Sequence, residues 1–443
     1  MKKFQKVISL LLIVFVVSAF IGPSTVFAAT WSQQDKITAS DAASSDFFGY
    51  RVSISGNYAV VGAYGDESST GAAYVFIKSG SSWTQQKKLT ASDAATDDEF
   101  GKSVFISGDY IAVGAPDEDG AGTDRGAVYI FYRNEGGTNN WGQQAKLTAS
   151  DGADSDWLGN SVSISGDYVI AGAFGDDTGG GAAGSAYIFE KGGSWSNSTE
   201  TQMIQSSDIT GGDSFGYSVS ISGTTAIIGA SGKNSNTGAA YIFERSGTWS
   251  QSAKLTASDG AGSDFFGISA SIDSDTSVVG AYGDESSTGA IYLFEKGGAW
   301  SNSTETAKLT ASDGAGSDRL GYSVSISGGT VIAGSYGDET NTGAAYLYEK
   351  GGNWSNMTET QKITASDAAT GDNFGRGVSI SGYYSVIGAP YNDDDGGSSG
   401  SAYVFESSMA SVPEFTDYVY FLTILIAVGL MYKVIPRQKT KEI

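Results

Sequence analysis

Apolar and polar positions alternate in short stretches of this chain, and those stretches recur along its length. The segment YSVSIS at 322–327 alternates apolar and polar residues, which is typical of a half-buried strand. A Ser-Gly turn follows, and the next stretch, such as YVIAGAF at 168–174, is nearly all apolar, as in a strand covered on both faces. A glycine-rich loop then leads to a third run (AAYVF, 72–76), and a Trp-led stretch (WTQQKKLTAS, 83–92) completes the unit. Each unit therefore predicts four antiparallel strands.

This unit occurs seven times. A four-stranded unit of about 54 residues cannot bury both of its faces alone, whereas seven units arranged in a ring cover one another. The chain opens with a lone Trp-led strand at 31–40, and its last unit stops at 403–406 without one, a complementarity that disfavours an open solenoid. We therefore predict an all-β, seven-bladed β-propeller over residues 29–410, closed by pairing of 31–40 with the strand around Tyr403. The Trp-led stretches begin, at intervals of 51 to 58 residues, at Trp31, Trp83, Trp141, Trp195, Trp249, Trp300 and Trp354.

Composition agrees with many short strands and limits the chemistry. The 443 residues include 62 Gly, 24 Tyr and 21 Phe but only five Pro. The chain contains no Cys and no His, which excludes thiolate nucleophiles, imidazole bases, disulfides and the usual zinc ligands. Carboxylate chemistry, either calcium binding or glycoside cleavage, stays open.

The two ends predict export and membrane attachment. Residues 1–28 begin with basic residues, continue with an apolar run and end in small residues, as a signal peptide does, with a transmembrane start as the alternative. Residues 418–432 are apolar and precede a basic tail. We expect 418–443 to form a transmembrane or sorting helix after a short spacer at 411–417. These features place the ring at the cell surface or envelope, anchored at its C-terminus.

Two short motifs recur in every unit. Phe-Gly or Leu-Gly precedes the alternating strand, and Gly-Ala-Pro or a variant ends the apolar strand, as at 114–116 and 388–390. This pattern resembles the FG-GAP repeat of integrin α-chain propellers and of many microbial surface proteins. The resemblance implies a propeller used for adhesion or recognition. The Phe-Gly and Leu-Gly pairs lie at 48–49, 100–101, 158–159, 215–216, 266–267, 320–321 and 374–375.

The chain departs from the integrin pattern at one point. Integrin repeats often carry a calcium loop, D-x-D-x-D-G-x-x-D, between the two halves of the motif, where alternating carboxylates surround the cation. This sequence has only short turns there, such as SGNY at 55–58. The resemblance therefore implies no calcium site at those positions.

The C-terminal end carries a second resemblance. VPEF at 412–415, the apolar helix and the basic end are similar to the PEF-type sorting signals of archaea and some bacteria. In that family a membrane transpeptidase cuts near the motif and attaches the protein to the envelope. The resemblance implies a sorting transpeptidase as a partner, and membrane attachment through the C-terminal helix or a transferred lipid. A plain tail anchor is the alternative.

Acidic residues dominate the predicted ring. Residues 29–410 contain 46 acidic and 19 basic residues, a net charge of −27. Such a field argues against nucleic acid or an anionic membrane surface as a partner and favours cations or basic ligands. Most carboxylates fall in the loops between blades and in those joining the second and third strands. These two sets should share one face, because the strands of a blade run up and down.

The loops between blades repeat a pair of Asp five residues apart. We interpret these pairs first as turn caps that accept backbone N–H bonds, since repeated residues usually build the repeat. Arg125 and Lys233 are almost the only cations in the acidic loops. The pairs are Asp41 and Asp46, Asp93 and Asp98, Asp151 and Asp156, Asp208 and Asp213, Asp259 and Asp264, Asp313 and Asp318, and Asp367 and Asp372.

Residues that depart from the repeat are the candidates for function. The loops at 117–124 and 392–397 are candidate calcium sites, with a solvated acidic loop as the alternative. Trp157 replaces Phe, Glu, Ser, Arg or Asn of the other units and could offer an exposed ring to a sugar or protein, whereas the seven strand-opening Trp are interpreted as packing residues. The candidate metal ligands are Asp117, Asp119, Asp124, Asp393, Asp394 and Asp395, and the candidates for ligand contact are Trp157, Glu118 and Arg125.

Four Asn lie in Asn-x-Ser/Thr sequons and are candidate glycosylation sites, which we expect in short turns on the face opposite the acidic loops. They are Asn197, Asn302, Asn353 and Asn356.

Together these observations predict a non-enzymatic adhesion or recognition module displayed at the cell surface. Its acidic loop face would bind an extracellular protein or glycan. A structural envelope component is the first alternative. An enzyme that cleaves glycans with a pair of carboxylates is the second.

Overall fold

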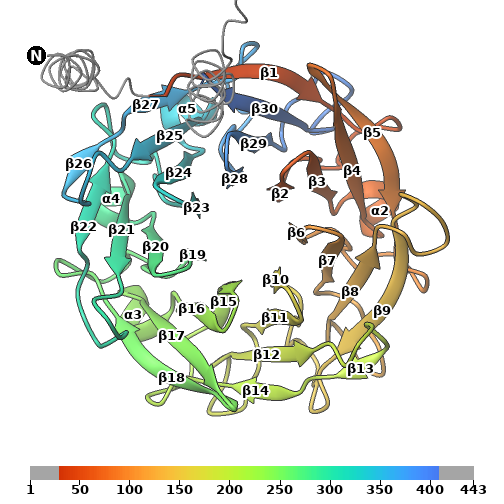
Figure 1. The fold of residues 1–443 in the computed structure, drawn as a ribbon, viewed down its shortest axis with the longest axis horizontal. Coiled ribbons are helices and arrows are strands. Elements are labelled where there is room, and N and C mark those ends of the chain that lie inside the picture. Colours follow the sequence, from red (N-terminus) through yellow and green to blue (C-terminus); the bar gives the residue numbers. More distant parts are fainter. Residues whose placement is uncertain (1–28, 409–443) are drawn as a thin grey trace, which may run out of the picture.

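Seven sheets, each with four antiparallel strands at its centre, surround a central axis in the computed structural model, which describes residues 29–408 (Figure 1). The strands of each blade follow one another from the axis outward, so the predicted seven-bladed β-propeller is confirmed. The predicted signal peptide, the spacer with its PEF motif and the apolar C-terminal helix lie outside the described residues. Between residues 29 and 408, no helix is long and apolar enough to cross a membrane.

The innermost strands alternate because their serines join neighbouring blades. The Ser53 hydroxyl accepts a hydrogen bond from the backbone N–H of Ile106 in the next blade (3.0 Å), and the Ser103 hydroxyl donates to the carbonyl of Gly159 (2.7 Å). These serines thus satisfy backbone groups at a blade interface. The innermost strands are β2 (Val52–Ser55), β6 (Ser103–Ser107), β10 (Ser161–Ser165), β15 (Phe215–Ser222), β19 (Ser269–Asp273), β23 (Ser323–Ser327) and β28 (Gly377–Ser381).

The second and third strands form the core. Their apolar side chains are buried between blades, as where Val60 and Val75 of the first blade meet Val113 of the second. The second strands are β3 (Tyr58–Ala63), β7 (Tyr110–Ala115), β11 (Tyr168–Ala173), β16 (Thr225–Ala230), β20 (Thr276–Ala281), β24 (Thr330–Ser335) and β29 (Tyr384–Ala389). The third strands are β4 (Ala72–Ser79), β8 (Ala127–Tyr132), β12 (Ser185–Glu190), β17 (Ala239–Ser246), β21 (Ala290–Glu295), β25 (Ala344–Glu349) and β30 (Ser401–Ser407).

The outermost strands begin within one residue of the repeated Trp in four blades, whereas in the other three blades they begin seven residues after it. None of these Trp is more than 7% exposed, which confirms that they pack between blades. The N-terminal strand β1 (Trp31–Ile37) pairs antiparallel with β30 and completes the seventh blade, as predicted. The other outer strands are β5 (Ser82–Leu89), β9 (Gly142–Thr148), β14 (Gln202–Ile204), β18 (Thr248–Leu255), β22 (Ala307–Thr310) and β27 (Gln361–Ile363).

The glycines of the two repeated motifs meet where blades approach most closely. A Cβ atom on Gly62 would lie 2.0 Å from the carbonyl oxygen of Gly101 in the next blade. Gly101 itself has φ +93°, a conformation that favours glycine. The motif therefore recurs because no side chain fits between these backbones.

Four short helical turns follow second strands on the loop face. In α2, Glu67 and Ser68 have φ values of 49° and 62°, so the turn is left-handed. These turns are α2 (Asp66–Ser69), α3 (Lys233–Asn236), α4 (Asp284–Ser287) and α5 (Asp338–Asn341).

Candidate binding face

The two acidic loop sets lie together on one face of the ring. The backbone N–H of Glu99, in a loop between blades, donates to the carbonyl of Ser69 in the loop after β3 (2.8 Å). Phe100 donates in the same way to Thr70 (3.2 Å). These bonds confirm the predicted shared face, which we call the loop face.

The second Asp of each pair caps a turn. Its carboxylate accepts the backbone N–H of the residue three positions earlier, at 2.6–3.0 Å in all seven blades. All seven of these Asp are buried. The turn-cap interpretation is confirmed for this half of the pair.

The first Asp of each pair has a different role. In the fifth blade, Asp259 accepts a hydrogen bond from the Tyr292 hydroxyl (2.9 Å) and forms an ion pair with Lys308 (2.7 Å). Lys308 also pairs with the buried Asp284 (2.7 Å). Burial alone would lower the pKa of Lys308, but its bonds to Asp259 and Asp284 raise it.

Lysines of the outer strands repeat this ion pair around the ring. The sequence-based view that the acidic loops have few counter-charges is therefore wrong, because the lysines come from a different element. Six blades have this pair, at 2.6–2.8 Å: Lys88 with Asp41, Lys146 with Asp93, Lys254 with Asp208, Lys308 with Asp259, Lys362 with Asp313 and Lys36 with Asp367.

The third blade lacks this lysine. Met203 pairs with Tyr187 in the register that Lys308 has with Tyr292. The Tyr187 hydroxyl lies within hydrogen-bond distance of Asp151 (3.0 Å) and Asp176 (2.5 Å), and within residues 29–408 neither carboxylate forms an ion pair with a lysine. Burial, together with Asp176, Asp151 and Asp177, raises the pKa of Asp156 to about 6.

Replacing Met203 by Lys is expected to stabilise the ring. A lysine ammonium at this position would lie between Asp151 and Asp176, as Lys308 lies between its two Asp. The free energy of unfolding should rise by about 1 kcal/mol in urea denaturation. The matched change Lys308→Met should lower it by a similar amount. A Met203→Lys variant less stable than the parent, beside a destabilised Lys308→Met variant, would contradict this role for the lysines.

The predicted cation ligands are dispersed over separate interactions. The Asp119 carboxylate accepts the backbone N–H of Asp124 (3.3 Å), and that of Asp393 accepts from Ser398 (2.6 Å). Asp394 forms an ion pair with Lys36, whereas Asp395 is exposed. Across residues 29–408, no group of three or more Asp, Glu, His or Cys could hold a metal ion.

The candidate contact residues of the second blade are also partnered. Glu118 pairs with Lys146 (2.7 Å), and Arg125 lies 3.5 Å from Asp154. Both line a hollow of ≈ 210 Å³. Asp117 turns elsewhere, because its carboxyl group shares a hydrogen bond with Glu99.

Asp117 is expected to make the ring less stable as the pH rises. Burial and the neighbouring Glu99 raise the pKa of Asp117 to about 7. Between its ordinary pKa and about 7, the folded state holds the proton more tightly than the unfolded chain, so the free energy of unfolding falls as the pH increases. Asp117→Asn should therefore be more stable than the parent at pH 8, by about 1 kcal/mol after screening by solvent, and similar to it near pH 4.

Urea denaturation at both pH values checks this expectation. The exposed Asp119→Asn serves as the control, and its stability should follow the parent at each pH. If Asp117→Asn does not increase the free energy of unfolding at pH 8, or increases it equally at both pH values, the raised pKa of Asp117 would be ruled out.

Aromatic rings surround the loop-face end of the axial channel, where the loops between blades enter the innermost strands. Phe47 stacks on Tyr64 with 5.1 Å between ring centroids, and Trp157 stacks on Phe174 at the same distance. Trp157 is half-buried, and Phe47 is its counterpart in the first blade. The expected isolated, exposed ring is therefore corrected to one member of an aromatic rim around the channel.

Three arginines lie among these rings, and none of them has an acidic partner within residues 29–408. Of the six arginines between residues 29 and 408, Arg125, Arg133 and Arg245 have a carboxylate within 4.0 Å. The other three contact tyrosine rings instead, which is unusual in a chain with 49 acidic residues. These three are Arg51, Arg319 and Arg376. We call the site formed by these arginines and the tyrosine rings they contact the axial mouth.

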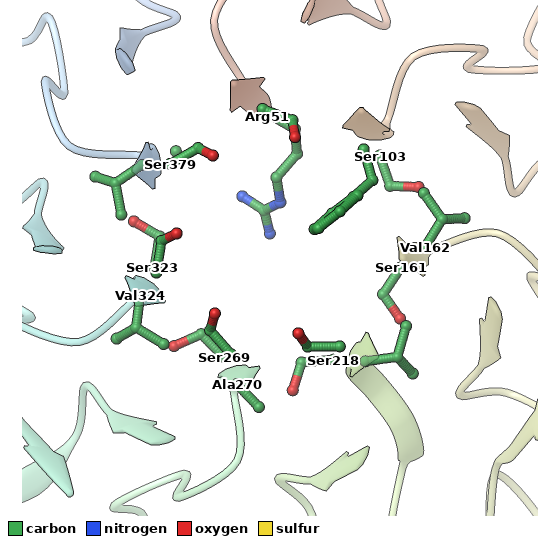
Figure 2. Close-up of a pocket in the computed structure, with 18 of the residues that line it drawn as sticks. Arg51, Ser103, Ser161, Val162, Ser218, Ser269, Ala270, Ser323, Val324 and Ser379 are labelled. Carbon is green, nitrogen blue, oxygen red and sulfur yellow. The ribbon is translucent and has the colours of Figure 1, made fainter. Parts of the chain in front are cut away.

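The channel below the mouth is narrow and lined mostly by serine and small apolar residues. Figure 2 shows the Arg51 side chain reaching toward the middle of this ring of residues. Arg51 is the one charged residue among those that line the channel in the described part of the chain. The channel has a volume of ≈ 140 Å³. Sequence reasoning missed this site. Its clearest signal was Arg51, at a position where the other six units have Ser or Gly, whereas Arg319 and Arg376 stand at positions that vary among the units.

The sequons lie on the outer rim, which corrects the expected position on the opposite face. The segment after Asn197 forms β13 (Ser198–Thr199), which pairs in parallel with β9 of the preceding blade, and β26 (Met357–Thr358) does the same with β22. The Asn197 side chain accepts the backbone N–H of Lys146 (2.8 Å). Asn302 and Asn356 bond to Lys254 and Lys308 in the same way, while Asn353 is exposed.

Seven four-stranded blades with one shared loop face define a repeat β-propeller. The FG-GAP repeat model matches residues 31–76, 83–131, 141–189, 198–243, 249–294, 303–348 and 357–405. The chain belongs to the FG-GAP repeat family, and the resemblance found in its motifs is confirmed.

Comparison with other proteins adds the fold alone. No curated protein matches this chain. A chain in the solved structure titled "Crystal Structure of Mitotic Checkpoint Complex" is similar to it, with a TM-score of 0.50 and 10% identity over 85% of this chain and 94% of that one.

Proposed function

We propose that this protein is a cell-surface propeller that recognises an extracellular protein or glycan through its loop face, without enzymatic activity. The observation that carries the proposal is the axial mouth. Arg51, Arg319 and Arg376 depart from the repeat, and all three converge on one end of the channel. Departures that converge at one point favour a ligand site over a purely structural disc.

The roles of the loop carboxylates support a non-enzymatic protein. Glycoside cleavage needs one carboxyl group as an acid and a second as a base or nucleophile, both facing an open site. Here the first Asp of most pairs is held by Tyr and Lys, and the second caps a turn, as Asp259 and Asp264 do. Two carboxyl pairs stand outside this pattern. Asp117 lies beside Glu99, whose partner Lys102 lies over the ring of Tyr64 (3.8 Å), and Asp151 and Asp176 meet at the Tyr187 hydroxyl.

Surface display rests on the ends of the sequence. We infer that residues 1–28 direct export and that 418–443 anchor the ring, either as a retained helix or through a transpeptidase that recognises the PEF motif. Mass spectrometry of the protein from its native envelope tests both points. An N-terminus at Ala29 and a C-terminus cut near 412–415 are expected for the sorted form. A retained C-terminus would indicate the plain tail anchor.

A binding screen tests the recognition function. The full-length chain is immobilised and probed with envelope glycans and secreted proteins, in calcium and in chelator, because Asp393, Asp394 and Asp395 crowd one exposed loop. Saturable binding that survives Tyr383→Ser, a change in an exposed turn of the opposite face, is the expected result. No binding in either condition by a folded ring would support the structural envelope role instead.

A further inference from the structure

We infer that the axial mouth binds the carboxylate of an acidic sugar at the end of a glycan, with the guanidinium groups of Arg51 and Arg376 as its anchors. This inference rests on the proposed recognition function and names the chemistry of its ligand. It is carried by the placement of the two arginines, by their unused hydrogen-bond donors and by the rings around them.

The two guanidinium groups approach the same tyrosines. The Arg51 Cζ atom lies 5.0 Å from the centroid of Tyr50 and 5.8 Å from that of Tyr322. The Arg376 Cζ atom lies 5.1 Å and 4.4 Å from the same two rings. Two like charges are thus held together at the axis by the faces of aromatic rings.

Most N–H donors of these two guanidinium groups have no strong acceptor in the described part of the chain. Arg51 donates to the backbone carbonyls of Tyr50 (3.3 Å) and Arg376 (3.4 Å), and Arg376 donates to the Tyr50 hydroxyl (3.3 Å). The buried Nε atom of Arg376 has no hydrogen-bond partner among the described residues. A carboxylate accepts two parallel N–H bonds from a guanidinium group, so it fits these donors in shape and charge.

The positive potential at the mouth also acts on Tyr50. Burial favours the neutral phenol, but Arg51, Arg376 and Lys102 lower the pKa of Tyr50 to about 8. Tyr64, Tyr217 and Tyr322 lie nearby, and burial raises the pKa of each. Tyr336, under Arg376, and Glu99 and Tyr391, beside Tyr64, are further titratable groups of this cluster. A bound anion would oppose the phenolate, so Tyr50 reports on occupancy of the mouth.

The surroundings favour a glycan with a single acidic sugar. Exposed carboxylates on the surrounding loop face, such as Glu67, Glu285 and Glu339, repel a polyanion, so only one anionic group is expected to enter the mouth. Half-buried rings such as Trp157 and Phe265 offer flat faces to sugar rings. Protein partners usually bury large apolar residues, but the exposed one between residues 29 and 408 is Tyr383, on the opposite face.

Calorimetric titration of the full-length chain with glucuronate tests the inference, with glucose as the uncharged control. We expect binding of glucuronate and none of glucose. Arg51→Gln and Arg376→Gln should each weaken binding about ten-fold or more. Arg245→Gln, which removes an arginine paired with Glu190, should leave the affinity unchanged.

A spectroscopic titration of the parent chain provides a test that does not depend on the folding of the arginine variants. In the parent chain, ultraviolet absorbance should detect one tyrosinate forming near pH 8, a signal that Tyr50→Phe removes. Glucuronate should move this transition to higher pH, and glucose should leave it in place.

Three results would overturn the inference: equal binding of the two sugars, full affinity in both arginine variants, or tighter binding of a short peptide through its free C-terminal carboxylate. In each case, a ligand found in the binding screen would still support the recognition function. A screen in which no ligand binds would contradict that function, whether or not glucuronate binds.

Discussion

Deletion of residues 29–42 is expected to abolish the cooperative unfolding of the ring. This segment contains β1, whose register with β30 runs from Trp31 opposite Ser407 to Ile37 opposite Ala402. Its loss would uncover the edge of β30 and remove the ion pair between Lys36 and Asp367. An open ring exposes the apolar faces that closure covers, and an unpaired edge promotes aggregation. Thermal unfolding followed by circular dichroism should change from one sharp transition to a broad one.

A permuted chain is the matched control. Thr30 and Ser408 already exchange backbone and side-chain hydrogen bonds, so β30 and β1 nearly form a hairpin. A chain that begins at residue 43 and carries 29–42 after Ser408 should recover the sharp transition, because it restores the same strand through a short turn. A deletion variant that melts like the parent would show that closure by β1 is dispensable.

Gly172→Ala is expected to destabilise the ring by about 3 kcal/mol or more, although it adds a single methyl group. The new Cβ atom would lie 1.8 Å from the carbonyl oxygen of Gly216 in the next blade and 2.6 Å from the Ser161 hydroxyl. Neither backbone can retreat, because each is held in a sheet. Urea denaturation of the purified variant should show a lower midpoint with an unchanged slope.

Gly192→Ala separates this effect from the loss of a glycine as such. Gly192 is exposed, and a Cβ atom there would meet nothing within 4 Å. Its substitution should change the free energy of unfolding by less than about 0.5 kcal/mol. Equal stabilities of the two variants would mean that the motif glycines serve something other than close approach of the blades.

The architecture could be predicted from the sequence because the repeat shows the strands of a blade, the number of blades and the way the ring closes. The alternating and apolar stretches predicted four strands, the seven Trp gave the number of blades, and the unmatched strand at 31–40 predicted how the ring closes. Each of these conclusions depends on period and phase, which a single sequence displays. The two parallel strands β13 and β26 escaped prediction, since they add to a neighbouring blade that the repeat does not reveal.

The candidate site could be predicted only in part. The loop face and the turn-capping Asp followed from the up-and-down order of strands. The ion pairs of residues such as Lys308 did not, because they join an outer strand to loops more than twenty residues away in the chain. The axial mouth escaped for the same reason: Arg51 and Arg376 are 325 residues apart in sequence and meet only when the ring closes.

The charges on the loop face fall into two groups, and only one of them is available for recognition. The acidic residues that dominate the composition are largely bound within their own blades, as Asp259 is by Lys308 and Tyr292. The few arginines that the ring leaves without carboxylates lie at the axis. The loop face is therefore acidic at its rim and cationic at its centre, and we place recognition at the centre.

Two double variants of the full-length chain test most directly whether the rim charges stabilise the ring while the central charges bind the ligand. Their affinity for glucuronate and their melting temperatures are measured. Asp259→Asn with Asp313→Asn removes rim ion pairs, and Arg51→Gln with Arg376→Gln empties the mouth. We expect the rim variant to melt at a lower temperature and bind with parental affinity, while the mouth variant stays folded and loses binding. Lost binding in the rim variant together with parental affinity in the mouth variant would contradict these roles of the charges.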